Sequence, residues 1–186
     1  MDKKDSLKAG HYEIQGETIA KFEFFENGFN PYSRYLDVDK VDLILRTREE
    51  KAVKYFEVQV KYGRLYDCSE KWSKKLFDVT CWKMFKLDEF KDHRPSLHIV
   101  LVLAHPDGYK GDIFIFPSEY FDALIRKGIH TNTKKGKRAK IYIARSLANG
   151  KWYLWKKWKF DEVTTDTAED VTEYRRNFKL TGAELI

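Results

Sequence analysis

The stretch "YFEVQVKYG" at residues 55–63 alternates between apolar and polar side chains, a pattern typical of a β-strand. Successive side chains of a strand point to opposite faces, so the apolar residues share one face and the polar residues the other. The polar face carries Glu57, Gln59 and Lys61. Alternation alone is equally consistent with a water-exposed face and with part of an active site. The segments around the strand therefore decide between the two.

The segment before this strand predicts a helix. Across residues 12–27, Ile14, Thr18, Phe22 and Phe25 recur at spacings of three and four, which places them on one helical face. We expect that face to pack against the rest of the molecule.

The strand itself predicts a β-hairpin with the segment that precedes it. "VDLILR" at 41–46 is short, apolar and rich in β-branched residues, and "REEK" at 48–51 predicts the turn. Asp42 stands inside this apolar segment, where a carboxylate buried without a partner or a metal would cost several kcal/mol. Pairing within the hairpin would bring Asp42 towards Gln59 and Lys61.

The remainder of the chain alternates between strands and helices, apart from residues 66–95, which show no clear period. We expect strands at 97–104, 111–116, 139–144 and 151–155, helices at 117–128 and 167–180, and a turn at 105–108. This order predicts an α/β fold with a single mixed β-sheet flanked by helices. We expect one domain over 1–186, with a catalytic core at about 12–63 plus 97–116 and a C-terminal hairpin and helix at 139–180.

Composition indicates a folded globular protein, and its basic charge suits a polyanionic partner. Of the 186 residues 42% are hydrophobic, and the net charge is +6 with a pI near 9.1. Two isolated cysteines, Cys68 and Cys81, predict reduced thiols. The first residues lack the apolar run of a secretory signal, and no run approaches the roughly 20 apolar residues of a membrane helix. We therefore expect a cytoplasmic protein that is neither secreted nor membrane-bound.

The polar residues of this region suit the hydrolysis of a phosphodiester bond. Such reactions commonly use carboxylates that hold Mg²⁺, a metal-bound water that attacks the phosphate, and a lysine that orients the water or offsets developing charge. Glu17 lies on the predicted helix, Asp42 on the first strand, and Gln59 and Lys61 share one face of the second. A helix packed on the hairpin could direct Glu17 towards the other three.

This order of residues resembles the PD-(D/E)XK nuclease superfamily. In that superfamily an acidic residue on a first helix and an aspartate on the next strand precede an acid-x-lysine pair. The "QVK" at 59–61 resembles the branch that includes a homing endonuclease of group I introns. That branch has a glutamate eleven residues before the "G-aromatic" that ends the helix, as Glu17 stands before "GF" at 28–29. The resemblance covers residues 12–63, and two features depart from it. No proline precedes Asp42, and a glutamine replaces the usual acid.

The resemblance implies a restriction-endonuclease-like fold and a metal-dependent endodeoxyribonuclease. Its catalytic set would be Glu17, Asp42, Gln59 and Lys61, with Mg²⁺ held by the first three and Mn²⁺ as a substitute ion. A glutamine supplies a carbonyl oxygen but no charge, so we expect weaker metal affinity than in the common form. Glu57 shares the polar face and would support the metal ligands.

Two lysine-rich segments are candidates for contact with the DNA backbone, which gives affinity without sequence information. The first contributes Lys134, Lys135, Lys137 and Arg138. In the second, at 151–160, Lys156 and Lys157 stand among tryptophans that could stack on bases. We expect DNA, in duplex form, as the partner, and a homodimer or higher oligomer, since cutting both strands usually needs two active sites.

Simpler interpretations stay open. Glu13 competes with Glu17 for the helix position, and Asp37 and Asp39 compete with Asp42. The polar face of 55–63 could be solvated, and Asp42 could pair with a nearby lysine. A nucleic-acid-binding module without catalysis is the alternative function, and a protein-interaction domain is a third.

Overall fold

The computed structural model describes residues 3–33, 40–49, 52–133 and 136–185, which form two six-stranded sheets with helices α1 (Lys3–Glu26) and α2 (Ser118–Lys127). The first sheet contains β1 (Asn30–Ser33), β2 (Leu43–Glu49), β3 (Ala52–Arg64), β6 (Leu97–His105), β7 (Gly108–Pro117) and β12 (Glu184–Leu185). The second contains β4 (Tyr66–Asp67), β5 (Phe77–Lys86), β8 (Ile129–Thr133), β9 (Gly136–Ser146), β10 (Trp152–Trp155) and β11 (Ala168–Asp170). Two 3₁₀ turns complete these elements, η1 (Ser73–Lys75) and η2 (Thr172–Tyr174).

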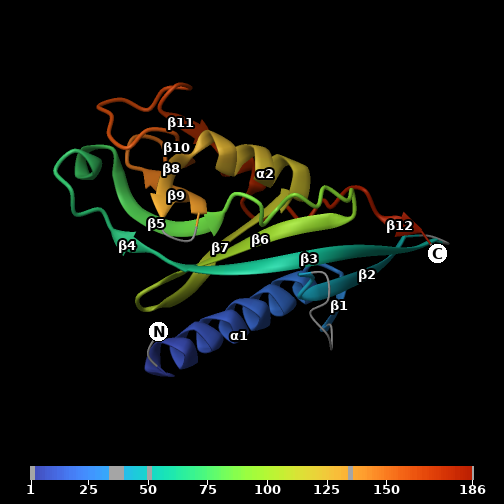
Figure 1. Cartoon of the computed structure of the whole chain (residues 1–186). Helices are drawn as coiled ribbons and strands as arrows, with labels where there is room; N and C mark the ends of the chain where they lie inside the picture. Colours follow the sequence, from blue (N-terminus) through green and yellow to red (C-terminus); the bar gives the residue numbers. More distant parts are fainter. Residues whose placement is uncertain (1–2, 34–39, 50–51, 134–135, 186) are drawn as a thin grey trace.

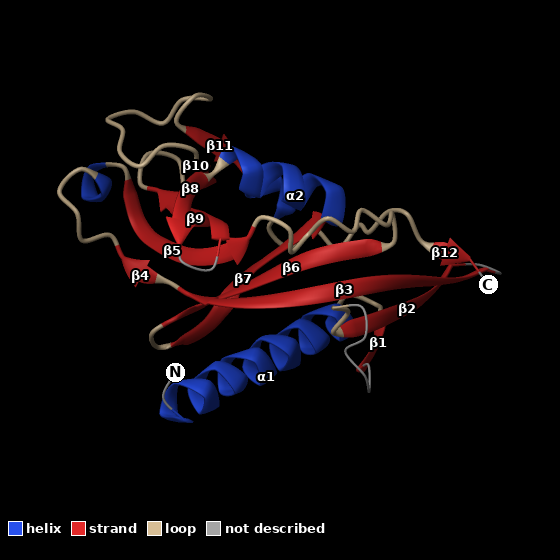
Figure 2. Cartoon of the chain, viewed as in Figure 1, coloured by secondary structure: helices blue, strands red, loops and turns tan. Residues whose placement is uncertain are grey.

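The elements form layers (Figures 1 and 2). Helix α1 lies on one side of the first sheet, and the second sheet and α2 lie on the other. The mixed α/β class is therefore confirmed, but the prediction of a single sheet is wrong. The strand that the sequence did not reveal is β5, which pairs with β9 along most of its length. Its inner face is apolar except at Lys83, and this interruption hides the alternation.

The first sheet has the order β1-β2-β3-β6-β7 and is antiparallel except where β3 runs parallel to β6. The predicted hairpin of β2 and β3 is confirmed, and its last strand pair joins Leu43 to Val58. Strand β6 is buried along almost all of its length because other elements cover both of its faces, as its continuous apolar run predicted. Beyond Leu65 the chain leaves this sheet and enters the second one as β4.

Helix α1 packs with a different face from the one we expected. The side chains of Ile14, Phe22 and Phe25 are 64%, 64% and 63% exposed, whereas Ala20 and Phe24 are fully buried. The prediction followed Ile14, Phe22 and Phe25, but the helix buries the face that carries the small residues Gly16 and Ala20 together with Phe24. A small face lets the helix backbone approach the sheet closely.

Gly16 shows how close this approach is. A β-carbon built at Gly16 would lie 2.9 Å from the β-carbon of Tyr62 on β3. Any larger residue would therefore push α1 away from the sheet. The helix positions its polar flank beside β3 because Gly16 and Ala20 allow this contact.

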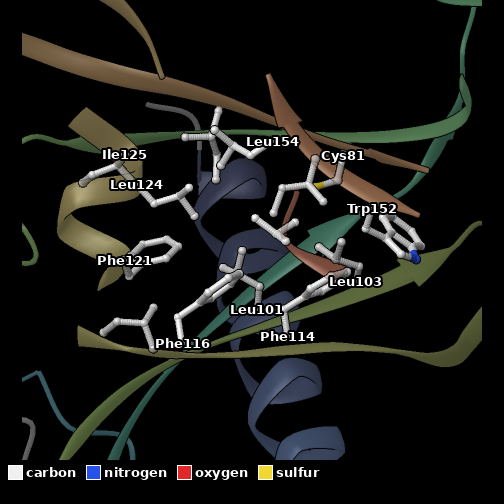
Figure 3. Close-up of a cluster of buried hydrophobic side chains, with 14 of the residues drawn as sticks. Cys81, Leu101, Leu103, Phe114, Phe116, Phe121, Leu124, Ile125, Trp152 and Leu154 are labelled. Carbon is white, nitrogen blue, oxygen red and sulfur yellow. The ribbon is translucent and has the colours of Figure 1, made fainter. Parts of the chain in front are cut away.

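The main hydrophobic core lies between the two sheets (Figure 3). Side chains of β6 and β7 meet those of β5, β10 and α2 there, among them Leu101, Leu103, Phe114, Phe116, Cys81, Trp152, Leu154, Phe121, Leu124 and Ile125. Helix α2 begins after Pro117 and is followed by Gly128, as the sequence predicted. A smaller cluster covers the outer face of the second sheet and includes Cys68, Phe77 and Trp155.

The predicted C-terminal helix at 167–180 is wrong. The segment forms β11, the short η2 turn and extended chain. Here side chains and distant strands satisfy backbone groups that a helix would pair internally. Asp170 Oδ1 accepts from the Thr172 amide, and Thr172 Oγ1 accepts from the Trp152 amide. Such local bonds compete with helix formation.

Neither described helix combines the length and the apolar character that crossing a membrane would require.

Candidate active site

The site forms where β2 separates from β3. After the pair of Leu43 and Val58, β2 no longer covers this edge of β3, and side chains take its place. The Asp42 amide donates to the Val58 carbonyl at 2.8 Å, and Asp42 Oδ2 accepts from the Val60 amide at 2.6 Å. Lys83 of β5 donates to the Tyr62 carbonyl further along. Asp42 therefore has a structural role as well as a place at the site.

A pocket of about 390 Å³ opens at this edge, between α1, β3 and the segment that follows β5. Its lining residues are all polar or charged, with four carboxylates, three ammonium groups and one amide, from Glu13, Asp42, Asp88, Glu89, Lys40, Lys61, Lys86 and Gln59. The structure thus brings Asp42, Gln59 and Lys61 together, as the spacing of the hairpin predicted. We refer to this cavity as the carboxylate pocket.

Gln59 and Lys61 reach the carboxylate pocket from the same face of β3. Gln59 is only 6% exposed, so this part of the polar face is covered rather than solvated. The Lys61 ammonium lies 3.0 Å from Glu89 Oε1 and 5.8 Å from the centre of the Phe90 ring. The segment after β5 therefore fixes the position of the lysine.

The helix contributes Glu13 to the pocket, whereas Glu17 is not among the residues that line it. Glu17 is half-buried one turn further along α1, and Glu13 is exposed. The two share a flank of the helix, because positions four apart lie one above the other. Glu13, the alternative to Glu17 on the helix, is thus the residue that faces the pocket.

Two charged residues, Glu89 in the pocket lining and Lys83 beside it, could not be identified from the sequence. Glu89 follows β5, and its carboxylate forms an ion pair with the Lys61 ammonium. Lys83 lies on β5 with its side chain half-buried, and burial lowers the pKa of its ammonium, as does the nearby Lys61 charge to a smaller extent. Both belong to the segment that lacked a clear period. The one available indication was a lysine at an inward position of the alternating stretch 77–86.

Glu57 is engaged outside the pocket. Its carboxylate lies 2.7 Å from the Arg94 guanidinium, and its amide donates to the Ser96 carbonyl. Glu57 shares the polar face of β3 with Gln59, but its contacts tie β3 to the loop before β6. The described contacts of Glu57 are therefore those of a residue that anchors the loop.

The donors in the carboxylate pocket are of the kind that a hard cation prefers. Asp42 and Gln59 offer carboxylate and amide oxygens, and Glu13 and Glu89 offer two more carboxylates. Within the described ranges, no three His, Cys, Asp or Glu side chains come close enough together to hold an ion by themselves. Mg²⁺ commonly binds through one or two carboxylates and keeps several waters, to which substrate phosphates are added. The residues present fit that kind of site.

The predicted basic residues lie at two places. Lys137 and Arg138 follow Gly136 in the first part of β9, and Arg138 pairs in register with Lys86, which lines the carboxylate pocket. Lys156 forms an ion pair with Glu169 at 3.4 Å, and Lys157 is exposed. Lys134 and Lys135, like the alternative acids Asp37 and Asp39, lie outside the described residues.

Comparison of the chain with protein-family models, curated proteins and solved structures found no match.

Proposed function

We propose that the protein is a metal-dependent endonuclease that hydrolyses phosphodiester bonds of DNA at the carboxylate pocket. The observation that supports this most is the meeting of Asp42, Gln59 and Lys61 with Glu13 in one polar pocket beside an open strand edge. A restriction-endonuclease-like fold, as the sequence resemblance implies, is part of the proposal. So is an assembly of two or more copies, which would cut both strands of a duplex.

Each residue has a distinct role in this proposal. Asp42 and Gln59 would hold Mg²⁺, or Mn²⁺ in its place, together with a glutamate of α1, either Glu13 or Glu17. The ion would supply a water of lowered pKa and neutralise charge on the phosphate. Lys61, held by Glu89, would orient the attacking water. The positive charges of Lys86, Lys137 and Arg138 would attract the DNA backbone.

Cleavage of supercoiled plasmid in the presence of Mg²⁺ or Mn²⁺ tests the proposal. Lys61→Met removes the ammonium and keeps the length of the side chain, and Asp42→Asn keeps an oxygen that can accept from the Val60 amide. We expect each to reduce cleavage by at least about 100-fold, in the range of one lost catalytic interaction. Excess EDTA should abolish cleavage by the unmodified protein.

Two matched substitutions control for surface charge. Lys110→Met and Asp107→Asn change an exposed ion pair at 2.7 Å that joins the β6–β7 turn to the start of β7, and neither residue lines the pocket. Both should cleave like the unmodified protein. Equal loss in all four variants, or cleavage that survives EDTA, would contradict the proposed site. Binding of DNA without cleavage under any metal condition would favour the non-catalytic binding module instead.

A further inference from the structure

A second pocket of about 770 Å³ lies on the outer face of the second sheet. It is walled by six aromatic side chains, Tyr66, Trp72, Trp82, Tyr142, Trp155 and Trp158. We refer to it as the aromatic pocket. It is formed where β4 and the loop into η1 meet β5, β9 and the segment after β10.

The aromatic rings divide into a packed set and an exposed set. Tyr142 stacks on Trp155 with ring centres 4.6 Å apart, and Trp72 contacts Trp155 at 4.8 Å. Trp82 and Trp158, by contrast, are 51% and 60% exposed. Two exposed rings that gather at one cavity form an apolar patch of the kind that can mark a binding site. The Lys140 side chain lies over both exposed rings, and much of each ring remains open to solvent.

The charges in and beside the aromatic pocket indicate which ligand suits it, because Lys159 lines the pocket and Lys140 lies next to three of its rings. The Lys140 ammonium lies 4.9, 5.1 and 5.0 Å from the ring centres of Trp82, Tyr142 and Trp158. The chain's own lysine therefore occupies the place that a cationic ligand would take among these rings. With Lys159 also at the wall, the pocket suits a ligand that combines a flat ring with a negative charge. A nucleotide has both, since its base stacks and its phosphate pairs with lysine.

The acids of the pocket fit the same ligand. Asp67 and Glu70 lie in its lining on the side formed by β4 and the following loop. Carboxylates repel a phosphate, but they accept hydrogen bonds from the amino groups of bases. The base would therefore point towards Asp67 and Glu70, and the phosphate towards Lys140.

The aromatic pocket and the carboxylate pocket each share lining residues with a cavity between them. A third cavity of about 480 Å³ shares Tyr66 and Trp82 with the aromatic pocket, and Glu13, Lys61 and Glu89 with the carboxylate pocket. From Trp82 to Lys86 is four residues of β5, or about 13 Å. This distance equals about four stacked nucleotides at 3.4 Å each, or fewer if the strand is stretched.

We propose that the aromatic pocket binds unpaired bases of a DNA strand whose backbone continues into the carboxylate pocket. The substrate class would then be DNA with a single-stranded segment beside the cleaved bond, such as an overhang or a flap. This inference rests on the proposed function only for what happens at the carboxylate pocket, because stacking itself requires no cleavage.

Fluorescence anisotropy in EDTA measures the binding apart from the chemistry. The full chain is titrated against a labelled blunt duplex, and against the same duplex with an eight-nucleotide overhang. We expect tighter binding of the overhang substrate. Trp82→Ala and Trp158→Ala should each weaken that binding about 5- to 150-fold and leave the blunt duplex unaffected. Lys140→Met should weaken overhang binding and reduce its salt dependence by about one counterion.

The control variant is Phe22→Ala, which removes an equally exposed aromatic ring from α1. It should bind both substrates like the unmodified protein, and thermal unfolding should show that all the variants are folded. Equal affinity for the two substrates, equal loss on both in the tryptophan variants, or tryptophan-dependent binding of a neutral oligosaccharide in place of DNA would each overturn the inference.

Cleavage separates this inference from the proposed function. Overhang binding that depends on Trp82, without cleavage in Mg²⁺ or Mn²⁺, would support the aromatic pocket and contradict the nuclease. Metal-dependent cleavage that is indifferent to overhangs and to both tryptophan substitutions would support the nuclease and contradict the aromatic pocket.

Discussion

Gln59 is the residue that departs most from the usual form of such a site. It offers a neutral amide oxygen, whereas most members of the PD-(D/E)XK superfamily, which this segment resembles, carry a carboxylate at this position. It is also the most buried of the residues that line the carboxylate pocket. A charge at this position would therefore act in a partly dehydrated environment, where electrostatic interactions with a cation are stronger than in water.

We predict that Gln59→Glu lowers the Mg²⁺ concentration required for half-maximal cleavage. A gain of about 1.4 kcal/mol in the metal interaction would correspond to a tenfold shift. A magnesium titration of plasmid cleavage measures it. Gln15→Glu adds the same charge at an exposed position of α1 and should leave the titration unchanged. An unaltered or increased magnesium requirement in the Gln59 variant would argue against Gln59 as a metal ligand.

The two cysteines are buried as free thiols, as expected for reduced residues. Burial raises the pKa of Cys81 to about 12 and that of Cys68 to about 11. Above pH 9 the unfolded chain loses these protons while the folded chain keeps them, so the unfolded state binds fewer protons and stability falls with rising pH.

We predict that the free energy of unfolding is constant with respect to these thiols below pH 9 and decreases from pH 9 up to the folded pKa values, about 11 for Cys68 and about 12 for Cys81. Urea denaturation at pH 8, 9 and 10 measures the slope. Cys81→Ala removes one of the two thiols, so its stability should decline less steeply than that of the unmodified protein. An identical slope in both proteins would show that Cys81 does not contribute.

At the scale of the elements, α1 shows how packing chooses among apolar residues. Phe22 and Phe24 stand two positions apart on the same helix, yet one is 64% exposed and the other is fully buried. Phe24 packs edge-on against Phe29 and Phe178 at 5.6 Å in each case. The spacing of large side chains alone predicted the wrong face, because the close contact of Gly16 with Tyr62 decides how the helix is rotated.

We predict that Phe24→Ala costs about 3–5 kcal/mol of unfolding free energy, because it leaves a cavity between α1 and the first sheet. Phe22→Ala, the matched control, should change stability by no more than about 0.5 kcal/mol. Urea denaturation of both variants compares them. Similar losses in the two would contradict the observed rotation of α1.

For the whole molecule, the C-terminal segment ties separate layers together. After η2 the chain crosses the β6–β7 hairpin, where Arg175 pairs with the buried Asp112 at 2.9 Å. The next residue, Arg176, reaches Glu23 of α1 at 3.0 Å, and Tyr109 donates to the same carboxylate at 2.6 Å. Burial and this carboxylate together raise the pKa of Tyr109. The segment that was predicted as a helix is therefore an extended chain that links β7 to α1 through these two ion pairs.

We predict that Arg176→Met destabilises the protein by about 1–3 kcal/mol. Among the described residues the buried Glu23 carboxylate would keep the Tyr109 hydroxyl as its partner, while the partial exposure of Arg176 limits the loss. Lys179→Met removes an exposed charge three residues later and should be close to neutral. Thermal unfolding of the two variants measures the difference. Equal melting temperatures would show that the ion pair contributes little to stability.

The sequence determined the features that depend on neighbouring residues. The alternation of 55–63 gave β3 and its two faces, and the hairpin with β2 followed from a charged turn between two short apolar runs. Helix α2 and the β9–β10 hairpin could also be predicted, because proline, glycine and turn residues act on the backbone beside them. The proximity of Asp42, Gln59 and Lys61 could be predicted because one local hairpin carries all three.

Only the tertiary structure decided what depends on distant contacts. Strand β5 lacked a clear period because Lys83 interrupts its inner face, and so neither the second sheet nor the position of Glu89 could be predicted. The choice of Glu13 over Glu17 as the pocket lining depends on how α1 rotates on Tyr62. The aromatic pocket joins residues from 66 to 159, and no local pattern can report which of those rings stay exposed. Periodicity describes which side a residue faces, whereas only packing fixes what lies opposite.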